Sequence, residues 1–297
     1  MDVAQTSFFF EHQSRRLLGV YLPVEQGAPE KVAVLCNGFA GEHVICRPHL
    51  THAARQLAAR GIPALRFDYT GYGDSEGDFV EATPERMAAD IEGAIAEAMR
   101  RSGASKAVLI GVRMGATLAA LVASRRDDVS ELLLWEPLPD LWKYIFAELR
   151  QTVAMQTLLF RDVRVNRDTI VENVLAEQPS LVDGYNMNCI DDGYRLGKGF
   201  IEGVKQVNLL EAPPALCART LVLHLRERPG KPGRPLVQLA EKLGAELETI
   251  VQQTLMWKHG RFYMTHSPLV VARSLDWLEG KPAAQDDSPA AEQGSQP

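Results

Sequence analysis

Cysteine is scarce in this sequence, and no two cysteines form a C-x-x-C pair. The four cysteines, Cys36, Cys46, Cys189 and Cys217, are scattered along the chain. This spacing argues against a disulfide framework and against a zinc site, so we expect neither a metal nor a cofactor. Reduced thiols are typical of the cytoplasm, and we expect the protein to be cytoplasmic.

The sequence also has no excess of positive charge and no long apolar run. A formal net charge of -6 at pH 7 argues against a dedicated nucleic-acid binder. No apolar stretch is long enough to span a bilayer, and residues 1–16 lack the basic start of a signal peptide. At 297 residues, of which 46% are hydrophobic and 24% charged, the chain fits one large α/β domain with an insertion, or two smaller domains.

A nucleophile is missing where the local pattern has a place for one. Residues 108–116 read as an apolar strand, a sharp turn and the start of an alanine-rich helix. This is the setting of a G-x-S-x-G nucleophile elbow, in which the glycines allow close backbone packing around a strained turn. Here Gly111 and Gly115 flank Arg113 in the place of serine. Arginine stays protonated and cannot attack a carbonyl, so the frame of a hydrolase lacks its usual nucleophile.

Short apolar runs alternate with helical patterns along most of the chain. After an expected hairpin at the N-terminus, we expect strands at residues 31–36, 62–67, 106–110, 131–135, 220–225 and 248–255. We expect helices at residues 48–60, 84–102, 114–124, 235–243 and 267–278. This alternation predicts βαβ units in a doubly wound, mostly parallel sheet, which is an α/β fold.

The alternation is interrupted once, in the middle of the chain. Residues 137–215 carry long helical patterns with no clear strand, which predicts a helical cap insertion over the carboxyl edge of the sheet. We therefore divide the chain into an α/β core of residues 1–136 and 216–280, the cap insertion, and a tail of residues 281–297. The tail is rich in Ala, Asp, Ser, Gln and Pro, and we expect it to be disordered.

Several features of the N-terminal half resemble the α/β-hydrolase superfamily. They are the opening hairpin, a strand that ends in Asn37-Gly38, the D-x-x-G-x-G-x-S spacing within Arg66–Gly77, and the elbow at Arg113. The pattern is most similar to the serine aminopeptidase-like branch. Within that branch, residues 134–137 and the helix with Tyr144 resemble hydrolases associated with exosortase A systems of bacterial exopolysaccharide clusters, as does the departure from serine. The resemblance implies the α/β-hydrolase fold with a helical cap.

The resemblance also implies positions for a nucleophile, an acid and a base. Arg113 occupies the position of the nucleophile. The acid belongs in residues 224–229, where the aspartate of the family is missing and Glu227 stands one residue out of register. The base belongs before the last helix, where His259 resembles the usual His-Gly run and His266 is a second candidate. We therefore predict Arg113, Glu227 and His259 as the remnant of the catalytic set.

The oxyanion hole is expected to persist because it uses backbone rather than side chains. Its donors would be the N–H of Met114 and one from Gly38-Phe39. Asn37, Glu42 and Glu136 stand near predicted strand ends, and we include them with His266 as candidates for the pocket lining.

Arg113 has three possible roles. In the first, the guanidinium pairs with Glu42, Glu136 or Glu227 and fills a disused site, since a partly buried cation needs an anionic partner. In the second, it binds a carboxylate or phosphate of a ligand bidentately, beside the free N–H groups of the following helix. In the third, it stabilises charge in an unusual catalytic arrangement.

Three functions remain open from the sequence alone. The chain is a hydrolase of esters, thioesters or amides with a non-standard site, a catalytically silent relative that binds a small anionic or acylated ligand, or an interaction protein of an exosortase or polysaccharide system. A separate alternative pairs Cys46 with His43 as nucleophile and base. We expect a small-molecule ligand and no nucleic acid, and the sequence predicts no oligomeric state.

Overall fold

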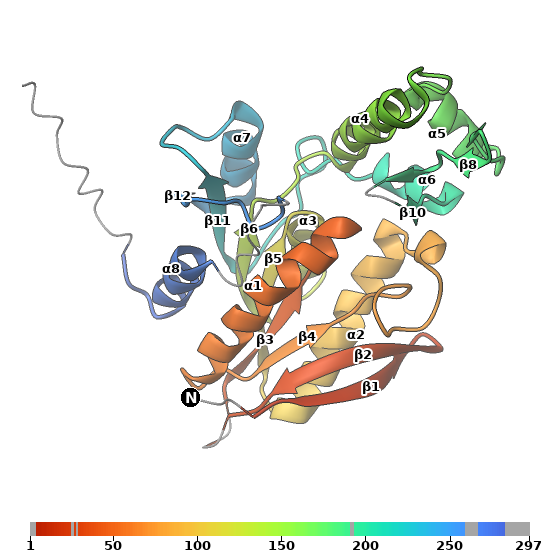
Figure 1. Ribbon diagram of the computed structural model, residues 1–297. Coiled ribbons are helices and arrows are strands. Elements are labelled where there is room, and N and C mark those ends of the chain that lie inside the picture. Colours follow the sequence, from red (N-terminus) through yellow and green to blue (C-terminus); the bar gives the residue numbers. More distant parts are fainter. Residues whose placement is uncertain (1–3, 25–26, 28, 191–192, 259–266, 283–297) are drawn as a thin grey trace, which may run out of the picture.

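The computed structural model describes residues 4–24, 27, 29–190, 193–258 and 267–282 (Figure 1). Its described part forms a central eight-stranded sheet in the order β1-β2-β4-β3-β5-β6-β11-β12. β1 and β2 pair antiparallel, as do β2 and β4, while every pair from β4 to β12 is parallel. The predicted doubly wound, mostly parallel sheet is confirmed.

The central strands of this sheet are short and mostly buried on both faces, whereas the edge strands β1 and β12 are mostly exposed or half-buried. In β5, every residue after Lys106 is buried, as expected for a strand that helices cover from both sides. The strands in chain order are β1 (Thr6–His12), β2 (Arg15–Leu22), β3 (Lys31–Cys36), β4 (Ala64–Phe67), β5 (Lys106–Val112), β6 (Val129–Trp135), β11 (Arg219–Arg226) and β12 (Glu246–Val251).

Two hydrophobic cores fill the two sides of the sheet. One core includes the buried faces of α2 (Pro84–Ser102), α3 (Met114–Ala123) and α7 (Arg234–Leu243). The other includes α1 (Gly41–Ala58) and α8 (Pro268–Leu278). Alternate side chains of each strand enter opposite cores, because successive side chains of a strand point to opposite faces.

The chain between β6 and β11 forms a separate layer, which we call the cap (Figure 1). Its helices are α4 (Leu141–Phe160), α5 (Arg167–Leu175) and α6 (Lys198–Val204). Two hairpins of two-residue strands lie between α5 and α6, namely β7 (Leu181–Val182) with β8 (Tyr185–Asn186) and β9 (Cys189–Ile190) with β10 (Tyr194–Arg195). The sequence did not reveal these strands, because two residues carry no measurable period.

Helix α1 begins earlier than the sequence predicted. The apolar residues at helical spacing predicted a helix from Pro48 to Arg60. In the structure α1 begins at Gly41, so Pro48 lies inside it. Proline cannot donate to the carbonyl four residues earlier, which is that of Val44, so this turn of α1 lacks one helical hydrogen bond. As a consequence, Glu42 lies in the first turn of a helix rather than in a loop.

Two further expectations concern membrane-spanning helices and the C-terminal tail. None of the helices in the described residues is both long and apolar enough to cross a membrane. From residue 283 onward, the tail that we expect to be disordered lies outside the described residues.

Candidate functional site

The turn between β5 and α3 consists of Arg113 alone. Its φ of 55° and ψ of -119° form a strained conformation for a residue with a side chain. A Cβ at Gly111 would lie 2.4 Å from the Cα of Ala116, and a Cβ at Gly115 would lie 2.1 Å from the carbonyl oxygen of Asn37. Both glycines are therefore required by close backbone packing between β5, α3 and the loop after β3.

The guanidinium of Arg113 lies between a carboxylate and two aromatic rings. Its Nε donates to Oε1 of Glu42 at 2.9 Å. Its Cζ lies 5.0 Å from the ring centroid of Tyr144 in α4 and 4.6 Å from that of Trp257, within the range of cation–π contacts. The Arg113 side chain is 13% exposed and that of Glu42 is 9% exposed, so the ion pair is largely desolvated.

Electrostatics keep Arg113 protonated. Burial by itself lowers the pKa of Arg113, but the charges of Glu42, Tyr144 and Glu136 and the hydrogen bond to Glu42 raise it overall. Of the partners predicted for Arg113, Glu42 forms the ion pair and Glu136 acts through its field.

Glu136 occupies the end of β6 and adopts a positive φ of 49°. Its Oε2 accepts a hydrogen bond from the N–H of Leu225 at 2.8 Å, and its own N–H donates to the carbonyl of Leu223 at 2.8 Å. Burial raises the pKa of Glu136, although the Leu225 N–H and the charge of Arg113 act in the opposite direction. The site therefore holds a carboxyl group that is reluctant to ionise, within the electrostatic reach of a fixed cation.

Backbone donors of the expected oxyanion hole differ in their availability. The N–H of Gly38 donates to Oδ1 of Asn37 at 2.8 Å, so Gly38 is already bonded. Within the described part of the chain, neither Phe39 nor Met114 donates its backbone N–H to an acceptor. The ring of Phe39 stacks on Phe200 of α6, with centroids 4.5 Å apart and planes 6° apart, which ties this loop to the cap. Phe39 and Met114 are thus the two backbone donors left for a ligand.

The predicted acid pairs with a surface lysine and forms no ion pair with Arg113 among the described residues. Glu227 is exposed, and its carboxylate oxygens lie 3.3 and 3.4 Å from Nζ of Lys258, so it forms a surface ion pair. The predicted base His259 and the second candidate His266 lie outside the described residues. His224 is a buried histidine that contacts Thr249, with Nδ1 3.2 Å from Oγ1, and burial lowers its pKa.

Cys46 and His43 do not form a nucleophile and base. Cys46 is fully buried and its Sγ donates to the carbonyl of Met256 at 3.5 Å. Burial and the charge of Glu42 raise the pKa of this thiol, although the charge of Arg113 acts against them, so it is not a reactive thiolate. His43 instead has its Nε2 at 3.0 Å from Oδ1 of Asp68.

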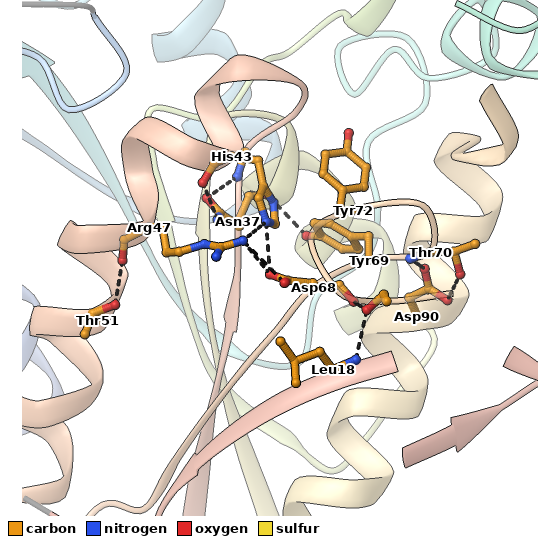
Figure 2. Close-up of polar contacts among 12 residues, drawn as sticks. Leu18, Asn37, His43, Arg47, Thr51, Asp68, Tyr69, Thr70, Tyr72 and Asp90 are labelled. Atoms are coloured by element: carbon orange, nitrogen blue, oxygen red, sulfur yellow. Dashed lines mark hydrogen bonds and ion pairs between the residues drawn. The ribbon is translucent and has the colours of Figure 1, made fainter. Parts of the chain in front are cut away.

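His43 belongs to a polar network with Asn37, Arg47 and Asp68, which the sequence did not predict (Figure 2). Nη2 of Arg47 donates to both carboxylate oxygens of Asp68, at 3.2 and 3.3 Å. Nδ2 of Asn37 donates to the carbonyl of His43 at 2.8 Å, which fixes the loop before α1. Burial by itself would raise the pKa of Asp68, but the hydrogen bond and charge of His43 and the charge of Arg47 lower it overall. Asn37, predicted for the pocket lining, therefore holds the backbone at Gly38 and His43 through its side-chain amide.

Comparison with known proteins identifies the family. The model of the serine aminopeptidase (S33) family matches residues 27–225, which is more than half of the chain. This chain belongs to the serine aminopeptidase (S33) family. The match spans the turn at Arg113, the loop at Phe39 and the cap.

Solved structures share the fold at low sequence identity. Est1E from Butyrivibrio proteoclasticus with ferulic acid bound has a TM-score of 0.62 and 16% identity, covering 92% of this chain and 98% of that one. The α/β hydrolase domain-containing protein 10 from mouse has a TM-score of 0.58 and 17% identity, with coverages of 93% and 99%. A Pyrococcus furiosus esterase has a TM-score of 0.56 and 15% identity, with coverages of 94% and 91%. A search of curated proteins found no match. The fold is that of the α/β hydrolases.

Proposed function

We propose that this protein binds a small ligand with an acyl carbonyl or carboxylate at the elbow, and that it forms no acyl-enzyme there. The single observation that carries the proposal is Arg113, a cation at the position of the nucleophile, fixed by Glu42 at 2.9 Å. No acyl group can be transferred to a protonated guanidinium, since it has no lone pair available for attack.

The donors around Arg113 favour an oxygen acceptor as ligand. Only Nε of Arg113 has a hydrogen-bond partner among the described residues, so both terminal amino groups can still donate. The backbone N–H groups of Phe39 and Met114 are available as well. A carbonyl or carboxylate oxygen placed between these donors would satisfy all of them, as the oxyanion does in an active relative.

The charge balance selects the kind of ligand. Glu42 already compensates Arg113, and Glu136 adds a carboxyl group whose raised pKa limits its negative charge. The site is therefore close to neutral, which favours a monocarboxylate or a neutral acyl ester over a multiply charged phosphate. The rings of Tyr144 and Trp257 provide the apolar side against which an acyl chain can pack.

A second candidate function is hydrolysis without a covalent intermediate, and Glu136 is the observation that favours it. A buried carboxyl group with a raised pKa beside a fixed cation is suited to general-base chemistry. Glu136 would take a proton from a water molecule, whose oxygen forms a bond to the acyl carbon. The tetrahedral oxyanion would lie on Arg113 and the backbone donors, and the departing alkoxide or thiolate would then regain the proton.

Two measurements separate these functions. The first is incubation with a fluorophosphonate probe followed by mass spectrometry, for which we expect no labelling, whereas stoichiometric labelling of any pocket residue would overturn both proposals. The second is turnover of p-nitrophenyl butyrate. If the wild type hydrolyses this ester and Glu136→Gln does not, the protein is a hydrolase rather than a binding protein.

Binding is tested directly with butyrate and hexanoate by calorimetry. We expect saturable binding to the wild type and a loss of about tenfold or more in Arg113→Met, because a charge-assisted hydrogen bond contributes that much. Arg113→Lys keeps the cation but loses the planar fork, so it should lie between the two. Arg161→Met, an exposed arginine of the cap, is the matched control. Equal affinity in wild type and Arg113→Met would refute the proposal.

We further propose that the protein acts in the cytoplasm of a bacterium with an exosortase A system. The likeness of residues 134–137 to the exosortase-associated hydrolases supports this setting. Co-purification with a protein of such a system that is insensitive to Arg113→Met would instead favour a role as an interaction protein.

A further inference from the structure

A second candidate site lies between α1 and the strands β2, β3 and β4. It is a crevice of about 40 Å³, lined on its polar side by Asn37, Arg47, Arg66 and Asp68. A buried water needs roughly 10–15 Å³, so the crevice has room for about three waters or one small oxyanion. Arg47 comes from α1, and Arg66 comes from β4.

The guanidinium of Arg66 lines the crevice, and one of its nitrogens lacks a partner among the residues that the structure describes. Its Nε is buried and has no hydrogen-bond partner among the described residues. Burial and the charges of Arg47 and Arg55 lower the pKa of Arg66 to about 10, although the charge of Asp68 acts in the opposite direction. A buried donor of a charged group without a partner is costly, so such a group normally has a protein, water or ion partner.

The crevice carries more positive than negative charge. Arg47 and Arg66 line the crevice with Asp68 as its carboxylate, and the charges of Arg47 and Arg55 both act on Arg66. Asp68 already accepts from Nη2 of Arg47 and lies 3.0 Å from Nε2 of His43. The negative charge of Asp68 is therefore compensated by Arg47 and His43, while N–H groups of Arg66 and the other nitrogens of Arg47 are available to a ligand.

We propose that this crevice binds a tetrahedral oxyanion of the phosphate class, held between Arg66 and Arg47. Guanidinium groups match the oxygens of phosphate in parallel pairs, and two of them on different elements can grip different oxygens of one anion. The crevice accommodates inorganic phosphate or the phosphate group of a small monoester, whose organic part would extend past Arg47, since 44% of that side chain is exposed.

This site is separate from the elbow but connected to it by Asn37. Asn37 lines the crevice, and its side chain also bonds the N–H of Gly38 and the carbonyl of His43. An anion that orders Arg66 and Arg47 would therefore stiffen the loop that presents the N–H of Phe39. The proposal does not depend on a ligand at Arg113.

The test is a phosphate titration of the full-length protein in phosphate-free buffer at constant ionic strength. Binding is measured by calorimetry and by the rise in melting temperature, which follows from binding to the folded state alone. We expect saturable binding to the wild type and a loss of at least about tenfold in Arg66→Gln. Arg60→Gln, which removes a surface arginine paired with Glu279, is the matched control and should bind as the wild type does.

Further variants test whether the anion binds in this crevice, and a second ligand tests whether it is free phosphate or a phosphate monoester. Arg113→Met should keep phosphate affinity, because the elbow is a different site. If Arg66→Gln does not fold, Arg47→Gln decides, and it should also weaken binding. Tighter binding of glycerol phosphate than of inorganic phosphate identifies a monoester, and the reverse identifies the free anion. The absence of saturable phosphate binding to the wild type, or unchanged affinity in both Arg66→Gln and Arg47→Gln, overturns the proposal.

Discussion

The ion pair between Arg113 and Glu42 predicts a large loss of stability when Arg113 is replaced by methionine. Arg113→Met removes the cation but keeps a long side chain between Tyr144 and Trp257, so the packing changes little. Glu42 then loses its guanidinium partner in a place where its side chain is only 9% exposed. A buried charge that loses its partner is strongly destabilising, because the desolvation of the remaining charge is no longer offset.

The expected magnitude follows from this burial. Removing one partner of a fully buried pair costs about 3–5 kcal/mol. Because Arg113 is still 13% exposed, we expect the lower end of that range, about 3 kcal/mol. The lost cation–π contacts add about 0.5–1 kcal/mol each, which the thioether of methionine partly offsets through its own aromatic contacts.

The assay is urea unfolding at pH 7 of the wild type, both single variants and the double variant. For a chain of this size, m is about 3 kcal/mol/M, so Arg113→Met should lower the urea midpoint by about 1 M. The double variant Arg113→Met/Glu42→Gln removes both charges and should return to within about 1 kcal/mol of the wild type, since replacing a buried pair by neutral groups is often tolerated. Arg161→Met is the control and should change stability by less than about 0.5 kcal/mol.

Two results would refute this reasoning. If Arg113→Met costs less than about 1 kcal/mol, the ion pair is solvated and Glu42 does not depend on Arg113 for its compensation. If the double variant is as unstable as the sum of the single variants, the two side chains are not energetically coupled, and the role given to Glu42 is wrong.

Three further variants test the surrounding groups. Glu136→Gln should raise the free energy of unfolding at pH 7. Because the pKa of Glu136 is raised in the folded state, the wild type loses stability as pH rises from about 4.5 through that pKa. Urea unfolding between pH 4 and 8 should show that this loss of stability with pH is absent in the variant. Asp68→Asn should cost about 2 kcal/mol at pH 7. Because the folded pKa of Asp68 is lowered, its contribution is full above about pH 4 and is lost as pH falls, so wild type and variant should converge in urea unfolding at low pH. Glu227→Ala should leave both stability and ligand affinity unchanged, since Glu227 forms only an exposed ion pair, and a tenfold loss of butyrate affinity would restore it to the site.

The strands and helices of the core could be predicted because their periods are local. The run of residues 106–110 became β5 and the alanine-rich run after Arg113 became α3. The start of α1 could not be predicted, because the apolar residues at helical spacing predicted a helix from Pro48 rather than from Gly41. The sequence therefore placed Glu42 in a loop, whereas in the structure it lies in the first turn of α1 and bonds Arg113.

The candidate site was predictable only in part. The sequence named Glu42, Glu136 and Glu227 as possible partners of Arg113, but it could not rank them, since all three stand near strand ends. Trp257 and the pair of His43 with Asp68 gave no signal, because their partners lie far away along the chain.

The sequence by itself determined the backbone of this protein's elbow. Gly111, Arg113 and Gly115 specify a strained turn between a strand and a helix, and the arginine in that turn cannot itself attack a carbonyl. Only the tertiary structure decided what the arginine does there. It brought Glu42 from 71 positions away and placed Tyr144 and Trp257 on the guanidinium, while Glu227 stayed at the surface. The physical reason is that parallel strands end at a common edge, where residues distant in sequence meet, and no local period records which of them come into contact.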